Sequence, residues 1–421
     1  MKFLNRFGDQ TLFLLSNMMF SGSTYIVMLG IPYMLNLEQM AQFSSMYNAL
    51  VLLLFTFELG ISLSFLRSYQ IHHIYKFLYV NFQLLTLVIL LFLFLTPLKY
   101  IFYYSFDLNK IDITFEIFLL AIIGQLSWIY IKNLLQSSKK FDRIFWLSFL
   151  ILCVRIFGML SLYLLGDITL NKVLLFVFVA PFSIIFILLS IYDTSIFVDE
   201  LNRFNKNMYK KRLLKVLYFY LKKLLSFSSI IYLNGILYIL AGRYLIIYLT
   251  KHDALILLAN LGFASVFLGI ITVLSASFKG FLVGTYHVGD QESIKKYLDQ
   301  LFKKLMFYIG LSVIISLCIS VIVYLIQPSY LDIKAPIFSF ILLLSYSLLF
   351  LISLITFLSK TMNYNILELK LNIFRLVVTV ILIHTFILDY PIGGFIAINA
   401  IMVLSEVWFA RQVLKRMKYV K

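Results

Sequence analysis

The stretch IFWLSFLILCVRIFGMLSLYLL, residues 144–165, decides the fold, and one charged residue, Arg155, interrupts it. A run of about 20 apolar residues lets an α-helix cross the roughly 30 Å hydrocarbon core of a bilayer. A guanidinium keeps its positive charge when it is buried, so an arginine at mid-helix needs polar partners or an aqueous cavity. The stretch therefore predicts a membrane-spanning helix and marks Arg155 as a candidate functional residue.

Similar apolar runs recur along all 421 residues. Hydrophobic residues make up 62% of the chain and charged residues 13%, whereas ordinary soluble domains hold about 45–50% and about 25%. The sequence predicts an all-α polytopic membrane protein with twelve transmembrane helices. The expected spans are residues 11–31, 42–66, 78–98, 114–135, 144–165, 171–192, 225–249, 254–278, 304–326, 336–358, 366–388 and 391–410.

A long charged connection divides these spans into two sets of six. It predicts a six-helix lobe over residues 1–192, a cytoplasmic linker over 193–224 and a second six-helix lobe over 225–421. Arg155 in the fifth span and Arg375 in the eleventh occupy corresponding places. Parallel repeats related by an axis along the membrane normal are a known transporter plan, so we expect lobes related by pseudo-two-fold symmetry.

Basic residues predict the orientation. Of the 36 Lys and Arg residues, 28 lie in or near the termini and the connections that share their side, and five lie in the opposite connections. An excess of Lys and Arg marks cytoplasmic loops, so both termini are expected in the cytoplasm. The net charge of +17 is therefore a topology signal, and we predict no nucleic-acid partner. Pro181, in the middle of the sixth span, predicts a kink.

The sequence holds no pattern typical of an enzyme or a metal site. A Gly-rich phosphate loop, a clustered His/Cys/Asp set and a nucleophile elbow are all missing from it. Cys153 and Cys318 lie in distant predicted spans. The extracytoplasmic connections are too short to carry a catalytic domain. We therefore expect neither catalytic residues, nor a metal, nor a cofactor.

Three arginines within predicted spans, Arg155, Arg375 and Arg243, are the first candidate site. Intramembrane charges usually face a bundle interior or a water-filled cavity, and a guanidinium pairs with phosphate or carboxylate. The three residues predict a cationic central cavity for an anion. The alternatives are a structural pair with a carboxylate on another helix and, for Arg243, a side chain that reaches the outer interface.

Two further groups of polar or charged residues can each be interpreted in two ways. Glu58 and Glu406, near the cytoplasmic ends of spans two and twelve, are candidates for ion coupling or for charge pairing with an arginine. Asn17, Ser21 and Thr24 belong to a polar stripe on the first span. Such a stripe indicates either a wet lumen or close helix packing.

Four motifs carry a family resemblance. They are FELGISLSFLRSYQ (57–70), LLQSSKKFDRIFWLSFL (134–150), AGRYLIIYLTKHDALILLANLGFAS (241–265) and VGDQESIKKYLDQLFKKL (288–305). With the twelve-span layout, they resemble the Wzx-type flippases of the multidrug/oligosaccharidyl-lipid/polysaccharide (MOP) superfamily, which handle O-antigen units. Gly242 stands where these relatives usually carry the acid of an acidic–basic pair.

The resemblance implies a flippase in the bacterial inner membrane. It would move an undecaprenyl-pyrophosphate-linked oligosaccharide from the cytoplasmic to the periplasmic leaflet by alternating access. A proton or sodium gradient would drive it, and its partners would be membrane lipids and other polysaccharide assembly proteins. The alternatives are a multidrug or cation antiporter of the same fold, and a membrane glycosyltransferase or polymerase.

Overall fold

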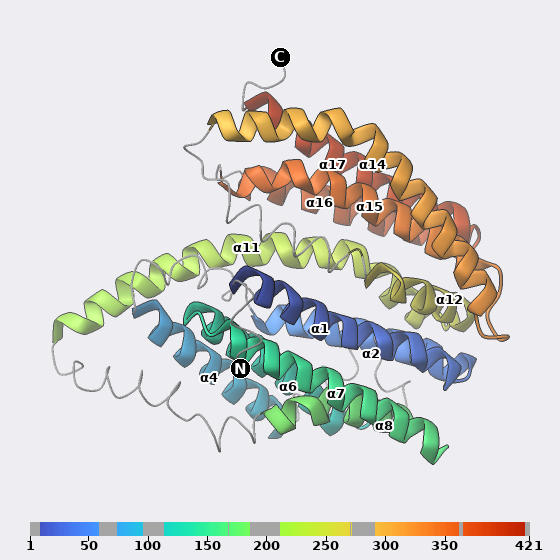
Figure 1. The fold of residues 1–421 in the computed structure, drawn as a ribbon, viewed down its shortest axis with the longest axis horizontal. Coiled ribbons are helices and arrows are strands. Elements are labelled where there is room, and N and C mark those ends of the chain that lie inside the picture. The colour runs from blue at the N-terminus through green and yellow to red at the C-terminus, as the bar shows by residue number, and fades with distance from the viewer. Residues whose placement is uncertain are drawn as a thin grey trace. The chain divides into compact units, whose positions relative to one another are not determined.

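The computed structural model describes residues 9–58, 74–95, 113–166, 168–185, 211–269, 271, 291–361 and 365–416. Every regular element within these ranges is helical (Figure 1), which confirms the all-α class. The elements are α1 (Asp9–Gly30), η2 (Ile31–Tyr33), α2 (Leu37–Glu58), α4 (Ile74–Leu95), α6 (Phe115–Ser137), α7 (Phe141–Leu165), α8 (Leu170–Val173), η4 (Leu174–Val179), α11 (Lys211–Lys251), α12 (Leu255–Val266), α14 (Gln291–Ile326), α15 (Lys334–Thr361), α16 (Asn365–Phe386) and α17 (Pro391–Arg416).

Eight helices in the described ranges are long and apolar enough to cross a membrane. Two shorter apolar helices cover Leu170–Ile185 and Leu255–Val266. The protein is therefore polytopic, as predicted. The number twelve stays a prediction, because several expected spans, such as 171–192 and 254–278, run into residues outside the described ranges.

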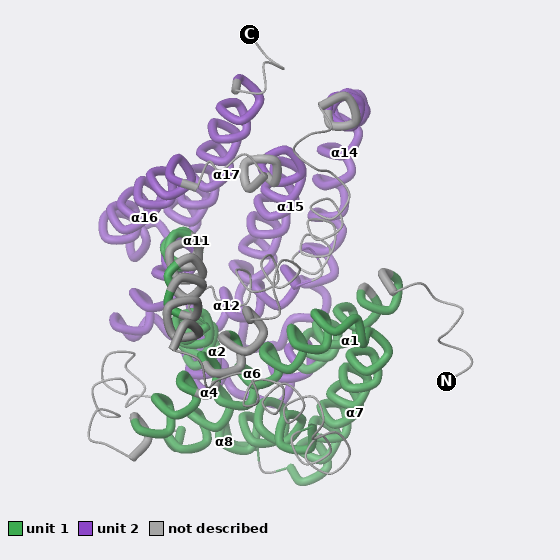
Figure 2. Tube along the Cα trace, turned by 90° about the vertical axis from the view of Figure 1, so that its left-hand side faces the viewer, with its two compact units in different colours: residues 1–27, 46–236 green, residues 28–45, 237–421 purple. Residues whose placement is uncertain are grey.

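Contacts divide the chain into two compact units. Unit 1 holds residues 1–27 and 46–236, and unit 2 holds residues 28–45 and 237–421 (Figure 2). The predicted lobes 1–192 and 225–421 stay a prediction. Most of the predicted linker, residues 193–210, lies outside the described ranges, and residues 211–224 form the first turns of α11.

The sixth predicted span changes its helical register just before Pro181. Its first turn, α8, leads directly into η4, a π-helical turn over Leu174–Val179, after which the helix continues to Ile185. Proline has no backbone N–H, and the backbone here follows the π-helical pattern, in which the N–H of Ala180 donates to the carbonyl of Leu175 five residues earlier. A wide turn next to a proline is a recognised cause of a bend, and it lies where the sequence predicts one.

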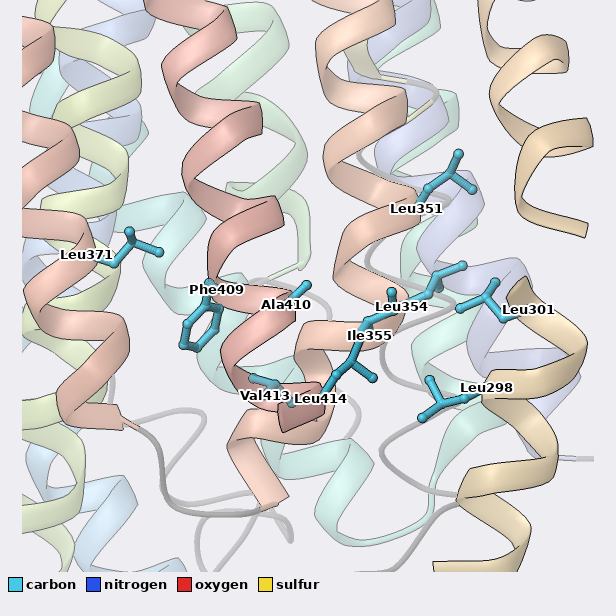
Figure 3. Close-up of a cluster of buried hydrophobic side chains, with 10 residues drawn as sticks. All are labelled: Leu298, Leu301, Leu351, Leu354, Ile355, Leu371, Phe409, Ala410, Val413 and Leu414. Atoms are coloured by element: carbon cyan, nitrogen blue, oxygen red, sulfur yellow. The ribbon is translucent and has the colours of Figure 1, made fainter. Parts of the chain in front are cut away.

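The core of unit 2 is a cluster of buried side chains shared by four helices (Figure 3). Leu298 and Leu301 of α14 pack toward residues of α15, α16 and α17. Their burial fixes the first turns of α14, which carry exposed lysines on the other side. The other members of the cluster are Leu351, Leu354, Ile355, Leu371, Phe409, Ala410, Val413 and Leu414.

Helices α2 and α12 make a close approach at Gly262. A Cβ atom at this position would lie 1.8 Å from Ser44 Oγ and 2.9 Å from Ser44 Cβ, so Gly262→Ala should force the two helices apart. We expect a destabilisation of about 1–3 kcal/mol, as for other overpacked interiors, measured by thermal unfolding in detergent. Gly242→Ala is the control, because a Cβ atom there meets nothing within 4 Å. Equal melting temperatures for the two variants would contradict the close contact.

Candidate functional site

Arg155 lies in the interior of unit 1. The residue is 1% exposed, and its side chain leaves α7 toward α1 and the sixth predicted span. Its guanidinium lies over two aromatic rings, 5.0 Å from the centre of Phe20 and 5.6 Å from that of Phe182. Aromatic faces attract a cation, so these rings stabilise the charge without neutralising it.

The hydrogen bonds of Arg155 all go to neutral oxygens. Nε donates to the carbonyl of Val177 at 3.2 Å. Nη1 donates to Ser23 Oγ at 2.8 Å, to Thr24 Oγ1 at 2.7 Å and to the Phe20 carbonyl at 3.3 Å. Within the part of the chain that the structure describes, Nη2 donates no hydrogen bond and no carboxylate pairs with this arginine.

The bond to Val177 explains why an arginine and a proline occur together here. Pro181 offers the Val177 carbonyl no α-helical i+4 donor, and backbone polar groups within a membrane need hydrogen-bond partners. Arg155 Nε donates to this carbonyl at 3.2 Å. One part of the side chain is therefore structural, while the charge itself has no counterion among the described residues.

A second cation lies in the same unit. Lys132 of α6 donates to Asn17 Oδ1 at 2.5 Å, and its ammonium group lies 5.5 Å from the centre of the Phe13 ring. The partners are again neutral, and no ion pair of Lys132 occurs in the described ranges. Sequence reasoning missed this residue because it counted Lys132 with the cytoplasmic connection, although Lys132 falls inside the predicted span 114–135.

The polar stripe of α1 meets both cations. Asn17 contacts Lys132, and Thr24, seven residues further on, contacts Arg155. Seven residues are about two helical turns, or about 10 Å, so the two cations lie at two levels of one helix face. Ser23, which sequence reasoning did not single out as a site residue, shares the contact with Arg155, whereas Ser21 is partly buried and makes neither contact.

Arg375 has a carboxylate partner in unit 2. The residue is 2% exposed, and its Nη2 donates to Glu406 Oε2 at 2.5 Å. Nε donates to Ser405 Oγ at 2.6 Å and Nη1 to Asn372 Oδ1 at 3.1 Å. Thr356 donates to the other carboxylate oxygen of Glu406 at 2.8 Å. Of the two roles left open for Glu406, charge pairing is the one present in this structure.

The two buried arginines have corresponding neighbours inside their own units. Arg155 contacts an aromatic ring of the first span, Phe20, and the backbone of the sixth. Arg375 lies 5.9 Å from the ring centre of Tyr238 in α11, the seventh span, and bonds to α17, the twelfth. The repeat predicts this correspondence, yet the second unit adds a carboxylate where the first has only carbonyl and hydroxyl oxygens.

The remaining predicted site residues are Arg243 and Glu58. Arg243 is partly buried in α11, eight positions before that helix ends at Lys251. Glu58 is partly buried in α2 and directly precedes residues outside the described ranges. In the described ranges no group of three or more His, Cys, Asp or Glu side chains is arranged to hold a metal ion.

No family model and no curated protein matches the chain. Two solved structures are similar to it along nearly the whole length. One is a MOP superfamily transporter from Pyrococcus furiosus, described as having a binding pocket of reverse polarity that suggests a different function. The other is an outward-facing multidrug resistance transporter of the MATE family. Each shares 15% identity and a TM-score of 0.52, over 99% of this chain and 97% of the other.

The chain therefore shares the fold of these two solved structures. The match covers 99% of the chain, so the shared fold includes the helices that carry Arg155 and Arg375. At this identity the likeness defines the fold and leaves open the Wzx-type assignment.

Proposed function

We propose that this protein is a flippase that moves an anionic lipid-linked oligosaccharide, of the undecaprenyl-pyrophosphate class, from the cytoplasmic to the periplasmic leaflet. The observation that carries the proposal is a pair of cations in unit 1, Arg155 and Lys132, whose described partners are all neutral. Arg155 and Lys132 lie within predicted spans, and neither has a carboxylate partner in the described ranges. A phosphate is the kind of ligand that such donors prefer.

Moving a pyrophosphate and its sugars through hydrocarbon unaided is prohibitive, because a charge taken out of water must be paired. Lys132 and Arg155 replace part of that hydration at two levels of α1. Arg155 is closed off in this structure, so the anion reaches it only in a conformation in which α1 separates from α7. In unit 2, Arg243 is a further candidate for contact with an anion, whereas the charge of Arg375 is paired with Glu406.

The transport cycle we propose is alternating access, in which one half of the molecule moves against the other. The sequence holds no nucleotide motif, so a proton or sodium gradient supplies the energy. The polyprenyl tail stays in lipid while the headgroup crosses. We place the protein in the bacterial inner membrane with both termini in the cytoplasm, beside other proteins of polysaccharide assembly.

A multidrug antiporter is the second candidate, favoured by the likeness to a MATE family structure. The deciding experiment is a deletion strain complemented with this chain. We expect loss of surface polysaccharide on deletion, recovery on complementation and unchanged sensitivity to cationic drugs. A deletion strain with normal surface polysaccharide and increased drug sensitivity would refute the flippase.

Lys132 gives a sharper test of the anion site. We expect Lys132→Gln to lower surface polysaccharide several-fold, because the bond to Asn17 survives in an amide while the charge is lost. The matched control is Lys139→Gln, an exposed lysine in the turn after α6, which should have little effect. The measurement is polysaccharide in whole-cell extracts at matched protein level. Equal results for the two variants would remove Lys132 from the site.

A further inference from the structure

Helix α14 of unit 2 is longer than a bilayer crossing requires. Its 36 residues, Gln291–Ile326, extend over about 54 Å at about 1.5 Å per residue, whereas the hydrocarbon core is roughly 30 Å thick. Four lysines lie in its first turns, and apolar residues dominate the part that follows. The helix therefore runs from a charged segment into a segment suited to hydrocarbon.

One side of the charged segment packs inside unit 2. Leu298 and Leu301 belong to the buried cluster shared with α15, α16 and α17 (Figure 3), and Phe302 packs against that cluster. Tyr297 OH donates to the Leu354 carbonyl of α15 at 3.2 Å. At 3.6 residues per turn these four α14 residues share one side of the helix. That side is therefore used by contacts within unit 2.

The lysines lie on the opposite side of the same turns. Lys295, Lys296, Lys303 and Lys304 are all exposed, and the helical period places them away from the packed side. Within the part of the chain that the structure describes, none of the four forms an ion pair or a side-chain hydrogen bond. Asp299 lies among them, so this side carries four positive charges against one negative charge.

The lysine side of α14 becomes apolar directly after the second lysine pair. Met306 and Phe307 are 81% and 67% exposed. Ile314, two turns after Phe307 on the same side, is also exposed. In the most apolar part of this span only 11% of the residues are buried, the lowest share among the eight candidate spans of the described ranges. One side of α14 thus changes from cationic to apolar within one turn.

A phospholipid has the same order of chemistry, with a phosphate next to two apolar chains. Lys303 and Met306 are three residues, or about 4.5 Å, apart along the helix axis, and the headgroup layer is about 5–7 Å thick in each leaflet. One lipid can therefore reach both levels. Lysine binds phosphate as a point charge, and clusters of about four to eight basic residues at the cytoplasmic end of a span are typical of anionic-lipid binding.

We infer that α14 binds an anionic phospholipid, whose phosphate is held by Lys303 and Lys304 and whose acyl chains lie along Met306 and Phe307. An acidic protein partner would match the lysines but not the exposed apolar residues that follow them. On the orientation proposed above, the lipid belongs to the cytoplasmic leaflet. This lipid site lies within unit 2 and does not depend on the transported substrate.

Quenching of tryptophan fluorescence by brominated lipids measures which lipids lie next to one position. Phe307→Trp places a reporter beside the lysines, in a full-length chain whose three native tryptophans are replaced by phenylalanine. In phosphatidylcholine vesicles that contain brominated phosphatidylglycerol, we expect an approximately threefold preference for the anionic lipid, because each basic residue near the surface contributes about 1 kcal/mol. Ile366→Trp in α16, where the native residue is 65% exposed, is the matched reporter and should show a clearly smaller preference.

Lysine variants test the phosphate contact. Lys303→Gln with Lys304→Gln removes the charge at nearly constant length, so the preference at Phe307→Trp should disappear. Lys303→Arg with Lys304→Arg keeps the charge and should keep the preference. The control is Lys370→Gln with Lys415→Gln, which removes two exposed lysines from α16 and α17 and should leave the preference unchanged.

A second measurement uses the chain with its native tryptophans. We expect the phosphatidylglycerol retained per protein molecule after purification in mild detergent to fall at least twofold in Lys303→Gln/Lys304→Gln and to stay unchanged in Lys370→Gln/Lys415→Gln. Equal preference at the two reporters, or an equal loss in the two glutamine variants, would overturn the lipid site and leave only a general attraction of basic segments to anionic membranes. Neither readout involves surface polysaccharide, so each outcome is independent of the flippase.

Discussion

Arg155→Ala should lower surface polysaccharide at least tenfold, because it removes a buried cation that has no carboxylate partner in the described ranges. Arg155→Lys keeps the charge but loses the forked geometry, so we expect partial activity. Polysaccharide is measured in a deletion strain at matched protein level. Activity of Arg155→Ala equal to that of the native protein would refute the anion site.

A fall in activity alone does not separate charge from folding, since Arg155 also bonds to the Val177 carbonyl. The chain offers a way to separate the two roles. Pro181→Ala adds a backbone N–H four residues after Val177, so we expect the double variant Arg155→Ala/Pro181→Ala to regain most of the stability lost in the single variant. An unsatisfied buried carbonyl costs about 1–3 kcal/mol, which thermal unfolding in detergent can resolve.

The double variant should fold and still not transport. Recovery of both stability and transport would mean that Arg155 only stabilises the helix that contains Pro181. Loss of both would mean that the bond to Val177 is not the main structural contribution of Arg155.

The class of fold was predictable because it follows from run length and composition alone. Any helix that crosses a bilayer must satisfy its own backbone and expose apolar side chains, so 62% hydrophobic residues in repeated runs leave few alternatives. The same reasoning marked Arg155 and Arg375, since a charge in such a run is expensive. The pattern could not reveal their hydrogen-bond partners on other helices, which lie 22 to 135 residues away in sequence.

Lys132 and residues 28–45 show that sequence order alone can mislead. Lys132 lies three positions before the predicted end of its span, so the sequence reasoning counted it with the loop charges. In the structure α6 continues to Ser137, and Lys132 donates a hydrogen bond to Asn17. Residues 28–45 precede the middle of the first predicted lobe, yet tertiary contacts with Thr250, Gly262 and Ile326 assign them to unit 2. Neither feature has a local signal, because both depend on which helices pack together.

Arg375→Ala should instead act mainly on stability. It leaves Glu406 without its cation, and Glu406 keeps only 15% of its side chain exposed. Removing one partner of a buried ion pair costs about 3–5 kcal/mol, whereas replacing both partners can be nearly neutral. We expect the lower end of that range, because Thr356 still donates to the carboxylate. Thermal unfolding of the purified protein gives the measurement.

The double variant Arg375→Met/Glu406→Gln distinguishes a structural pair from a substrate site. It removes both charges together, keeps an acceptor for Thr356 and fills the space of the guanidinium with an apolar chain. We expect a melting temperature close to that of the native protein and surface polysaccharide within about threefold of native, which corresponds to under 1 kcal/mol. A stable double variant that lacks polysaccharide would mean that Arg375 binds the anion when the pair opens. Glu406 would then be a gate on the cation of Arg375 rather than its permanent counterion.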